Sequence, residues 1–309
     1  MAKPFKTVEE QVGILKQRGL QIKDDAVTAR YLLFNNYYNV VNHYGKFFQI
    51  NTDIYIDGAT FDEIRCLFLF DKELKSLLFK ACLDIEKNIK SLTAYYYSEN
   101  FRAPYAYLNP DNYEIPNDEH TERCINKLKE LINKNKSYTS QCAISHYATF
   151  HEDIPLWVLT NEMQFGTINS LYKNMKMDIR NKVAKCFAES FENEYNAKVL
   201  ITPDVLWKSM YGIQELRNVC GHNNRLLNHN FRYSIPFVPI LYPSGYDGST
   251  NRNNVYHVYL QMKLFLKKEQ FNSLTNAIKK RMRNYLKNKI HSIPYNYILK
   301  SLGFPKDWV

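Results

Sequence analysis

The stretch Glu215-Leu216-Arg217-Asn218-Val219-Cys220-Gly221-His222-Asn223-Asn224-Arg225 closes a segment whose pattern predicts a buried helix. That helix should begin at Thr202-Pro203-Asp204, which supplies an N-cap, a proline at the first position and an acid beside the helix dipole. Its apolar side chains recur at helical spacing: Val205, Leu206, Met210, Ile213, Leu216 and Val219 or Cys220. A helix end that only packs does not need so many Arg, Asn and His residues, so we expect a ligand there.

The composition indicates a globular, mainly α-helical protein. The chain has 309 residues, of which 45% are hydrophobic, so it can bury one large core or two ordinary ones. Aromatic residues reach 15% while there are only 10 glycines, and this balance favours helices over a turn-rich β fold.

The formal net charge of +10 is typical of proteins that bind nucleic acid, and an anionic membrane surface would also attract it. There is no run of about 18 apolar residues, so we expect no membrane span. The first residues lack the apolar core of a signal peptide, which predicts a cytoplasmic protein. The six cysteines form no Cys-x2-Cys pair, so we expect reduced thiols, no metal site and no cofactor.

We expect three segments that pack together: a helical and aromatic segment at 1–58, a helical core at 59–229, and an extended stretch with helices at 230–309. Capping boxes at Thr7 and Thr60 open helices in the first two. Residues 49–59 are predicted to be a loop, and residues 230–242 to be extended. From about residue 60 to residue 100 the pattern is helical throughout, and its length predicts a break or bend near Asp71.

Four further local predictions concern helix surfaces and ends. Glu86 and Lys90, four residues apart, are interpreted as a solvated ion pair. Gly166 is expected to end a helix that starts at Pro155, and Thr167 to begin the next one. The aromatic residues between 34 and 48 favour core packing, with base stacking as the alternative. One face of the last long helix gathers positive side chains that suit either phosphate contacts or plain solvation: Lys279, Lys280, Arg283 and Lys287.

The polar helix end can be read as a site for cutting RNA without a metal ion. Asn218 and His222 share one helix face, and the long side chain of Arg217 can reach the same groove. A histidine can take the proton of a 2′-hydroxyl or protonate the leaving 5′-oxygen, while an arginine stabilises charge on the phosphorane-like transition state. Arg225 and His229 would position the substrate. The alternative is a helix C-terminus at which these side chains only satisfy carbonyl groups and the dipole.

One histidine cannot easily act as both acid and base in a single step. Either two chains therefore combine their motifs, or water or an oxygen of the product fills the second role. The products would be a 2′,3′-cyclic phosphate and a 5′-hydroxyl.

The stretch from Leu216 to Asn228 resembles the motif of HEPN-type proteins, in particular the bacterial abortive-infection Abi family of the AbiD and AbiF type. The family form is roughly RN-x-x-A-H-x-x-R-L-W-N. The chain keeps the residues Arg217, Asn218, His222, Arg225 and Asn228. It departs from the family form at Gly221, where Ala is usual, and at Leu227, where Trp is usual.

Other similarities to this family follow in order along the chain, and Lys90 stands where relatives usually carry Arg. They are Asn36-Tyr37-Tyr38 with Tyr44 and Phe48, Phe70-Asp71-Lys72-Glu73-Leu74-Lys75, Ile85-Glu86-Lys87-Asn88-Ile89-Lys90, Pro155-Leu156-Trp157 with Phe165-Gly166, and Gly303-Phe304-Pro305-Lys306-Asp307-Trp308.

The resemblance implies a HEPN-type helical bundle with additional N- and C-terminal helices and a short extended or loop insertion. It also implies RNA cleavage through Arg217 and His222, with Asn218 orienting them, a role in phage defence, a homodimer, and association with a small noncoding RNA. The competing hypothesis is a defence module that binds RNA without cutting it. A nucleotidyl- or AMP-transferring protein is a third, but no glycine-rich phosphate loop supports it.

Overall fold

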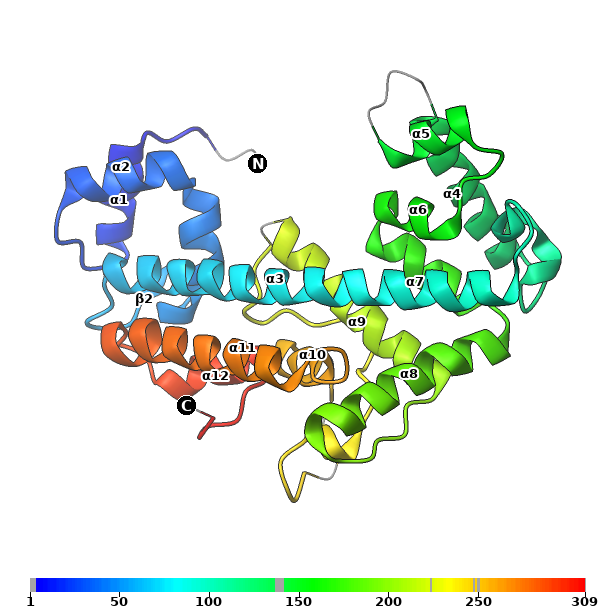
Figure 1. Ribbon diagram of the computed structural model, residues 1–309. Coiled ribbons are helices and arrows are strands. Elements are labelled where there is room, and N and C mark those ends of the chain that lie inside the picture. The colour runs from blue at the N-terminus through cyan, green and yellow to red at the C-terminus, as the bar shows by residue number, and fades with distance from the viewer. Residues whose placement is uncertain (1–3, 137–141, 223, 247, 249–250, 309) are drawn as a thin grey trace.

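The computed structural model describes residues 4–136, 142–222, 224–246, 248 and 251–308, and its fold is built on one long helix, α3 (Phe61–Asn100) (Figure 1). The predicted capping box opens this helix, because the Thr60 hydroxyl accepts a hydrogen bond from the Glu63 amide and the Glu63 carboxylate accepts one from the Thr60 amide. The helix then continues through Asp71 without a break and runs nearly straight (Figure 1), so the predicted break or bend is wrong. Asp71 is fully buried and its carboxylate bonds to other segments instead of competing for the helix backbone.

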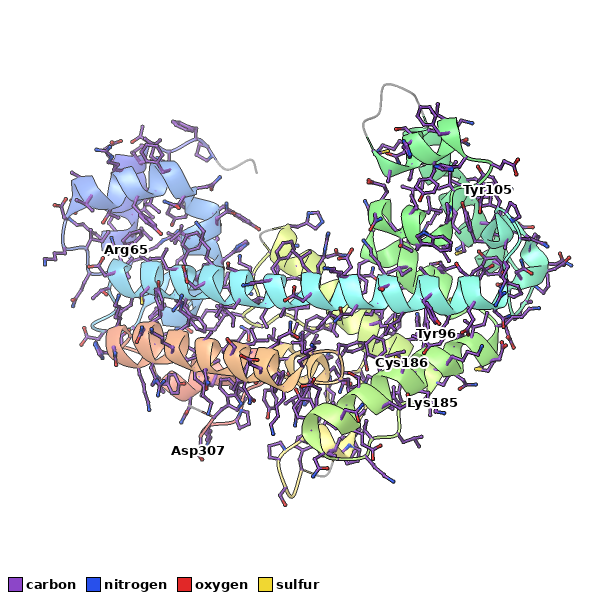
Figure 2. All side chains as sticks on the ribbon, in the orientation of Figure 1. Arg65, Tyr96, Tyr105, Lys185, Cys186 and Asp307 are labelled. Atoms are coloured by element: carbon purple, nitrogen blue, oxygen red, sulfur yellow. The ribbon has the colours of Figure 1, made fainter. Side chains whose placement is uncertain are left out.

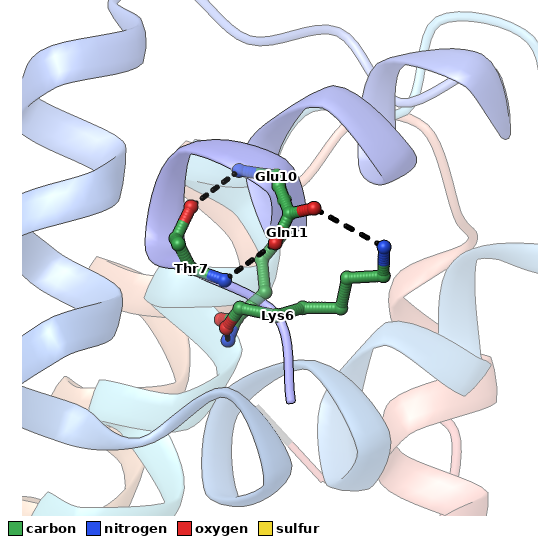
Figure 3. A network of polar contacts seen from close by, with 4 residues as sticks. All are labelled: Lys6, Thr7, Glu10 and Gln11. Atoms are coloured by element: carbon green, nitrogen blue, oxygen red, sulfur yellow. Dashed lines mark hydrogen bonds and ion pairs between the residues drawn. The ribbon is translucent and has the colours of Figure 1, made fainter. Parts of the chain in front are cut away.

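The N-terminal segment packs against the first turns of α3. Its elements are α1 (Val8–Gln17), α2 (Asp25–Asn35), a π-helical turn η1 (Tyr38–Asn42), a 3-10 turn η2 (Gly45–Phe48), and the strands β1 (Gln49–Asn51) and β2 (Ile54–Tyr55). The Thr7 capping box forms as predicted, and Lys6 adds an ion pair to Glu10 (Figure 3). Within the predicted loop at 49–59, residues 49–55 instead form a short antiparallel hairpin, while residues 56–59 have no regular structure. Asp53 makes its tight turn by taking a positive φ of 67°.

A second group of helices packs along the rest of α3. They are the 3-10 turns η3 (Ala106–Leu108) and η4 (Pro110–Asn112), and the helices α4 (Glu119–Asn135), α5 (Ala143–Phe150), α6 (Leu156–Glu162), α7 (Phe165–Asn174), α8 (Met177–Tyr195) and α9 (Pro203–Gly221). Tyr96 on α3 faces Cys186 on α8 (Figure 2), and burial together with this contact raises the pKa of Tyr96 to about 12.

Gly166 does not end a helix, contrary to the prediction. It lies in the first turn of α7, and Thr167 lies inside that helix. A Cβ atom at position 166 would come within 3.0 Å of Gln214 Nε2 on α9. The glycine therefore serves the close approach of two helices, a requirement that local sequence does not reveal.

The C-terminal segment covers another side of α3. It contains a 3-10 turn η5 (Pro239–Leu241), α10 (Val255–Met262), α11 (Lys268–Arg281), a π-helical turn η6 (Met282–Lys287) and α12 (Tyr295–Leu302). Residues 230–242 form no strand; backbone hydrogen bonds from Phe231 and Ile235 hold them to Asn253 and Arg252. One hydrophobic cluster includes side chains from all three segments, from Val12 to Phe304. The expected mainly helical fold is confirmed.

No helix within the described ranges is both long enough and apolar enough to cross a membrane.

A buried histidine in the C-terminal segment makes stability depend on pH. His257 Nδ1 lies 2.7 Å from Asn254 Oδ1, and its Nε2 lies 3.0 Å from the Tyr246 hydroxyl. Burial lowers the pKa of His257 from 6.5 to about 4, and Arg252 acts in the same direction.

The unfolded chain therefore binds more protons than the folded one between pH 4 and pH 6.5. This contribution to stability is complete above pH 6.5, and we expect it to be lost as the pH falls to 4. Urea unfolding at pH 7.5 and pH 5 measures it, with His257→Gln as the variant that lacks the titrating group. Equal pH dependence in the two proteins would show that His257 does not contribute.

Candidate active site

The candidate site is the C-terminal end of α9. The helix begins as predicted, with the Thr202 hydroxyl accepting a hydrogen bond from the Val205 amide and with Pro203 in the first turn. It ends at Gly221, and His222 is the C-cap residue, whose amide donates to the Asn218 carbonyl oxygen at 2.9 Å. His222 is exposed. Figure 1 shows this end above α3, between the block of α1 and α2 and the block of α4 to α7.

Arg217 lies one turn before the helix end and is held from two sides. Its Nε lies 3.6 Å from Glu86 Oε2 on α3, and its guanidinium lies 5.7 Å from the centre of the Phe79 ring. It also donates a hydrogen bond of 3.5 Å to the Asn218 side chain. The side chain is partly exposed, so a cation paired with Glu86 lies little more than one turn before the exposed residue His222 on the same helix.

Gly221 allows the Phe79 ring to come close to α9. A Cβ atom at position 221 would lie 3.3 Å from Phe79 Cε2, closer than ordinary contact. Gly221, which stands where the family usually has Ala, therefore lies where the Phe79 ring that flanks Arg217 packs tightly against α9.

Glu86 and Lys90 are not a solvated surface pair, contrary to the prediction. Glu86 is buried, and its Oε1 lies 2.9 Å from Lys90 Nζ while its Oε2 faces Arg217. The i,i+4 spacing was a correct guide to the pairing but not to the environment, since α6 and α9 pack over this part of α3. Glu86 therefore positions the arginine of the candidate site.

The segment after α9 is fixed to α3 by a buried polar cluster. Asp71 accepts hydrogen bonds from the Tyr44 hydroxyl at 2.8 Å and from the Leu226 amide at 3.1 Å. Lys75 Nζ lies 3.3 Å from Asp71 and donates to the Asn224 carbonyl oxygen. Burial raises the pKa of Asp71, and burial with the adjacent carboxylate raises that of Tyr44. The sequence motif around residue 71 thus anchors the segment that follows His222.

Arg225 and Asn228 hold this segment to neighbouring parts of the chain. Arg225 donates a hydrogen bond to the carbonyl oxygen of His43, and its guanidinium lies 5.8 Å from the centre of the Phe47 ring. Asn228 adopts a left-handed conformation with φ of 58°, which Asn tolerates better than most residues, and its amide bonds to the Ser301 carbonyl oxygen. Both residues therefore hold the segment after α9 in place through contacts within the protein.

The other predicted RNA-binding residues lie at different distances from this helix end. His229 Nε2 lies 3.4 Å from Glu215 Oε1 on α9 itself. The basic residues of the last long helix belong to α11 and η6, and Figure 1 shows α11 on the other side of α3 from the end of α9. There, Lys279 lies over Trp308 and Lys287 over Tyr295, whereas Lys280 and Arg283 are exposed. The structure does not bring them together with His222.

A groove between α3 and α6 extends the candidate site. Its volume is about 620 Å³, and Glu86, the partner of Arg217, lines it together with Lys87, Lys90, Tyr95 and Trp157. Trp157 was identified from the sequence only as part of a stretch similar to the family, and neither Trp157 nor Tyr95 was assigned to the site. Among the described residues, no three His, Cys, Asp or Glu side chains are grouped so as to hold a metal ion.

Removing the Glu86 carboxylate should destabilise the fold. Glu86→Ala leaves Arg217 and Lys90 without their common partner in a buried setting, so we expect the free energy of unfolding to fall by about 1–3 kcal/mol. Glu189→Ala is the matched control, because Glu189 pairs with Lys185 on an exposed surface and should cost less than about 1 kcal/mol. Urea unfolding of both variants measures this, and equal losses would contradict the assigned role of Glu86.

The fold and the site together define a mainly helical protein with an Arg- and His-bearing polar helix end fixed on one long central helix. The sequence model of the Abi-like protein family matches residues 30–228, which include α3, α9 and the whole candidate motif. The chain belongs to this family, which points to abortive infection, a form of defence against phage. No curated protein and no solved structure matches the chain.

Proposed function

We propose that the chain is an endoribonuclease that acts in abortive infection without a metal ion. The observation that supports this best is the end of α9, where exposed His222 follows Arg217 by little more than one turn and buried Glu86 fixes that arginine. A purely structural helix end does not need a buried carboxylate paired with a partly exposed arginine little more than one turn before an exposed histidine.

In the proposed reaction the RNA supplies its own nucleophile. The 2′-oxygen attacks the adjacent phosphorus, the bond to the 5′-oxygen breaks, and His222 either accepts the 2′-hydroxyl proton or protonates the leaving oxygen. Arg217 stabilises the negative charge that develops on the phosphoryl oxygens, and Asn218 orients Arg217 through their side-chain contact. The products are a 2′,3′-cyclic phosphate and a 5′-hydroxyl.

One chain provides one copy of this motif. We propose that two chains combine their copies in a homodimer, so that one His222 acts as base and the other as acid, as expected of a HEPN-type nuclease. The net charge of +10 suits a protein that binds RNA in the cytoplasm, either as substrate or as a small noncoding RNA partner.

A second candidate function is RNA binding without cleavage. It is favoured by the single exposed histidine among the described residues of this helix end, since one imidazole cannot easily act as both acid and base in one step. The net charge of +10 suits RNA binding in either case. RNA affinity would then fall steeply with salt concentration while the RNA remained intact.

Incubation of the purified protein with a single-stranded RNA and with the matching DNA separates these functions. The nuclease should cut the RNA and leave the DNA intact, because DNA lacks the 2′-hydroxyl. A single 2′-deoxynucleotide at the cleaved position should block that cut alone. Intact RNA under conditions of full binding would favour the binding module, and equal cleavage of DNA would overturn the proposed mechanism.

A further inference from the structure

A groove on the same side of α3 as the end of α9 carries exposed aromatic residues that the fold leaves uncovered. Trp157 in the first turn of α6 is 56% exposed, although its neighbours Leu156 and Val158 are buried. Tyr95 on α3 lines the same groove and is 59% exposed. Large aromatic side chains left in water at one groove are typical of a surface that binds a ligand.

The charges in this groove favour an anionic ligand. Lys87 is exposed and Lys90 is partly exposed, and both line the groove. Among the residues that the structure describes, buried Glu86 is the one carboxylate that lines the groove, and it already faces both Lys90 and Arg217. Two lysines line the groove against this one carboxylate, whose charge Arg217 also offsets from outside the lining, so the groove has a positive excess.

The groove also connects to the candidate active site. Glu86 lines the groove and also pairs with Arg217 of the candidate site. Tyr95 lies nine residues further along α3, so it is about 14 Å from Glu86 along the helix axis. Figure 1 shows both α6 and the end of α9 above α3. A volume of about 620 Å³ falls within the usual range of small-molecule sites.

We propose that this groove binds an unpaired nucleobase of the RNA, which stacks on Trp157 and Tyr95 while Lys87 contacts the backbone phosphate. Every base offers a π-face and every nucleotide a phosphate, so this combination binds single-stranded RNA with little sequence preference. A base within a duplex is already stacked and paired, so the substrate class is RNA with a single-stranded segment. The proposal rests on the proposed RNA function and names the substrate that this site takes.

The test measures the affinity of a fluorescently labelled single-stranded 12-nucleotide RNA by anisotropy, in the His222→Ala background so that the RNA stays intact. Trp157→Ala should weaken binding about tenfold, which corresponds to about 1.4 kcal/mol and lies within the range of one base–aromatic stack. Trp157→Phe should retain most of the affinity, whereas Trp157→Leu, which keeps apolar volume but no ring, should lose it. A blunt-ended RNA duplex of the same length, which has no unpaired base, should be insensitive to all three.

Tyr297→Ala is the matched control, because this tyrosine of α12 is 49% exposed but does not line the groove. An RNA affinity that Trp157→Ala leaves unchanged overturns the proposed subsite. So does a Trp157→Leu variant that binds RNA as tightly as the Trp157→Phe variant. A loss of dimerisation without a change in RNA affinity would instead assign the groove to a contact between two copies of the chain.

The failure of the subsite and the failure of the proposed function give different results. If wild-type protein cuts RNA and Trp157→Ala leaves affinity and half-saturating RNA concentration unchanged, the subsite is wrong and the nuclease stands. If Trp157→Ala weakens binding but wild-type protein leaves RNA intact, the subsite stands and the nuclease is wrong.

Discussion

His222→Ala should lower the rate of RNA cleavage by about 10²–10⁴-fold, the usual contribution of one general acid or base. The imidazole belongs to an exposed C-cap residue, and only its backbone amide is used to close α9. The substitution should therefore change the free energy of unfolding by less than about 0.5 kcal/mol. Cleavage rates at saturating RNA, together with urea unfolding, measure the two effects separately.

His120→Ala is the matched control, since His120 is an exposed histidine on α4 and should leave the cleavage rate unchanged. Arg217→Lys extends the test, because lysine keeps the charge near Glu86 but lacks the planar guanidinium that binds two phosphoryl oxygens. The Arg217→Lys variant should cleave RNA more slowly than the wild type, and its free energy of unfolding should be higher than that of Arg217→Ala. His222→Ala protein that cuts at the wild-type rate would contradict the proposed role.

Asp71→Ala should cost about 3–5 kcal/mol of folding free energy, the largest stability loss that we expect from a single substitution in the site. The carboxylate is fully buried, and its removal leaves the Tyr44 hydroxyl, the Leu226 amide and the Lys75 ammonium without their common acceptor. Asp71→Asn keeps one oxygen for hydrogen bonds but loses the charge that Lys75 faces, so its loss should be intermediate.

Urea unfolding measures these losses, and Asp84→Ala on the exposed side of the same helix is the control, with an expected change below about 0.5 kcal/mol. A double-mutant cycle with Tyr44→Phe isolates the 2.8 Å hydrogen bond, for which we expect a coupling free energy of about 1.5–3 kcal/mol. A loss below about 1 kcal/mol for Asp71→Ala would mean that the cluster does not anchor the segment after α9.

The parts of the fold that sequence predicted correctly depend on neighbours in the chain. The capping boxes at Thr7 and Thr60 and the Thr202 start of α9 need only a few adjacent residues, so their patterns were sufficient. The break at Asp71 and the stop at Gly166 were wrong because partners far along the chain decide both positions. The Leu226 amide donates a hydrogen bond to Asp71, and the Gln214 side chain lies against Gly166.

The same division applies to the candidate site. The order of Arg217, Asn218 and His222 on one helix end was visible in the sequence, because helical spacing alone defines it. Glu86 was assigned to solvent, since no local pattern shows that α6 and α9 cover that part of α3. Trp157 lies among buried apolar residues in sequence, and only the tertiary structure shows that it faces outward.

The chemistry of the product ends tests the central claim most directly. An RNA of defined sequence that carries a 5′-fluorophore is cut with purified protein in the presence of EDTA. The labelled fragments are treated with phosphatase with and without prior acid, because only acid opens a cyclic phosphate, and the downstream fragments are tested for direct labelling by polynucleotide kinase, which requires a 5′-hydroxyl. We predict fragments that end in a 2′,3′-cyclic phosphate with a 5′-hydroxyl on the downstream piece, and no such fragments from His222→Ala protein. Ends with a 3′-hydroxyl and a 5′-phosphate would contradict attack by the RNA's own 2′-oxygen, and with it the proposed roles of Arg217 and His222.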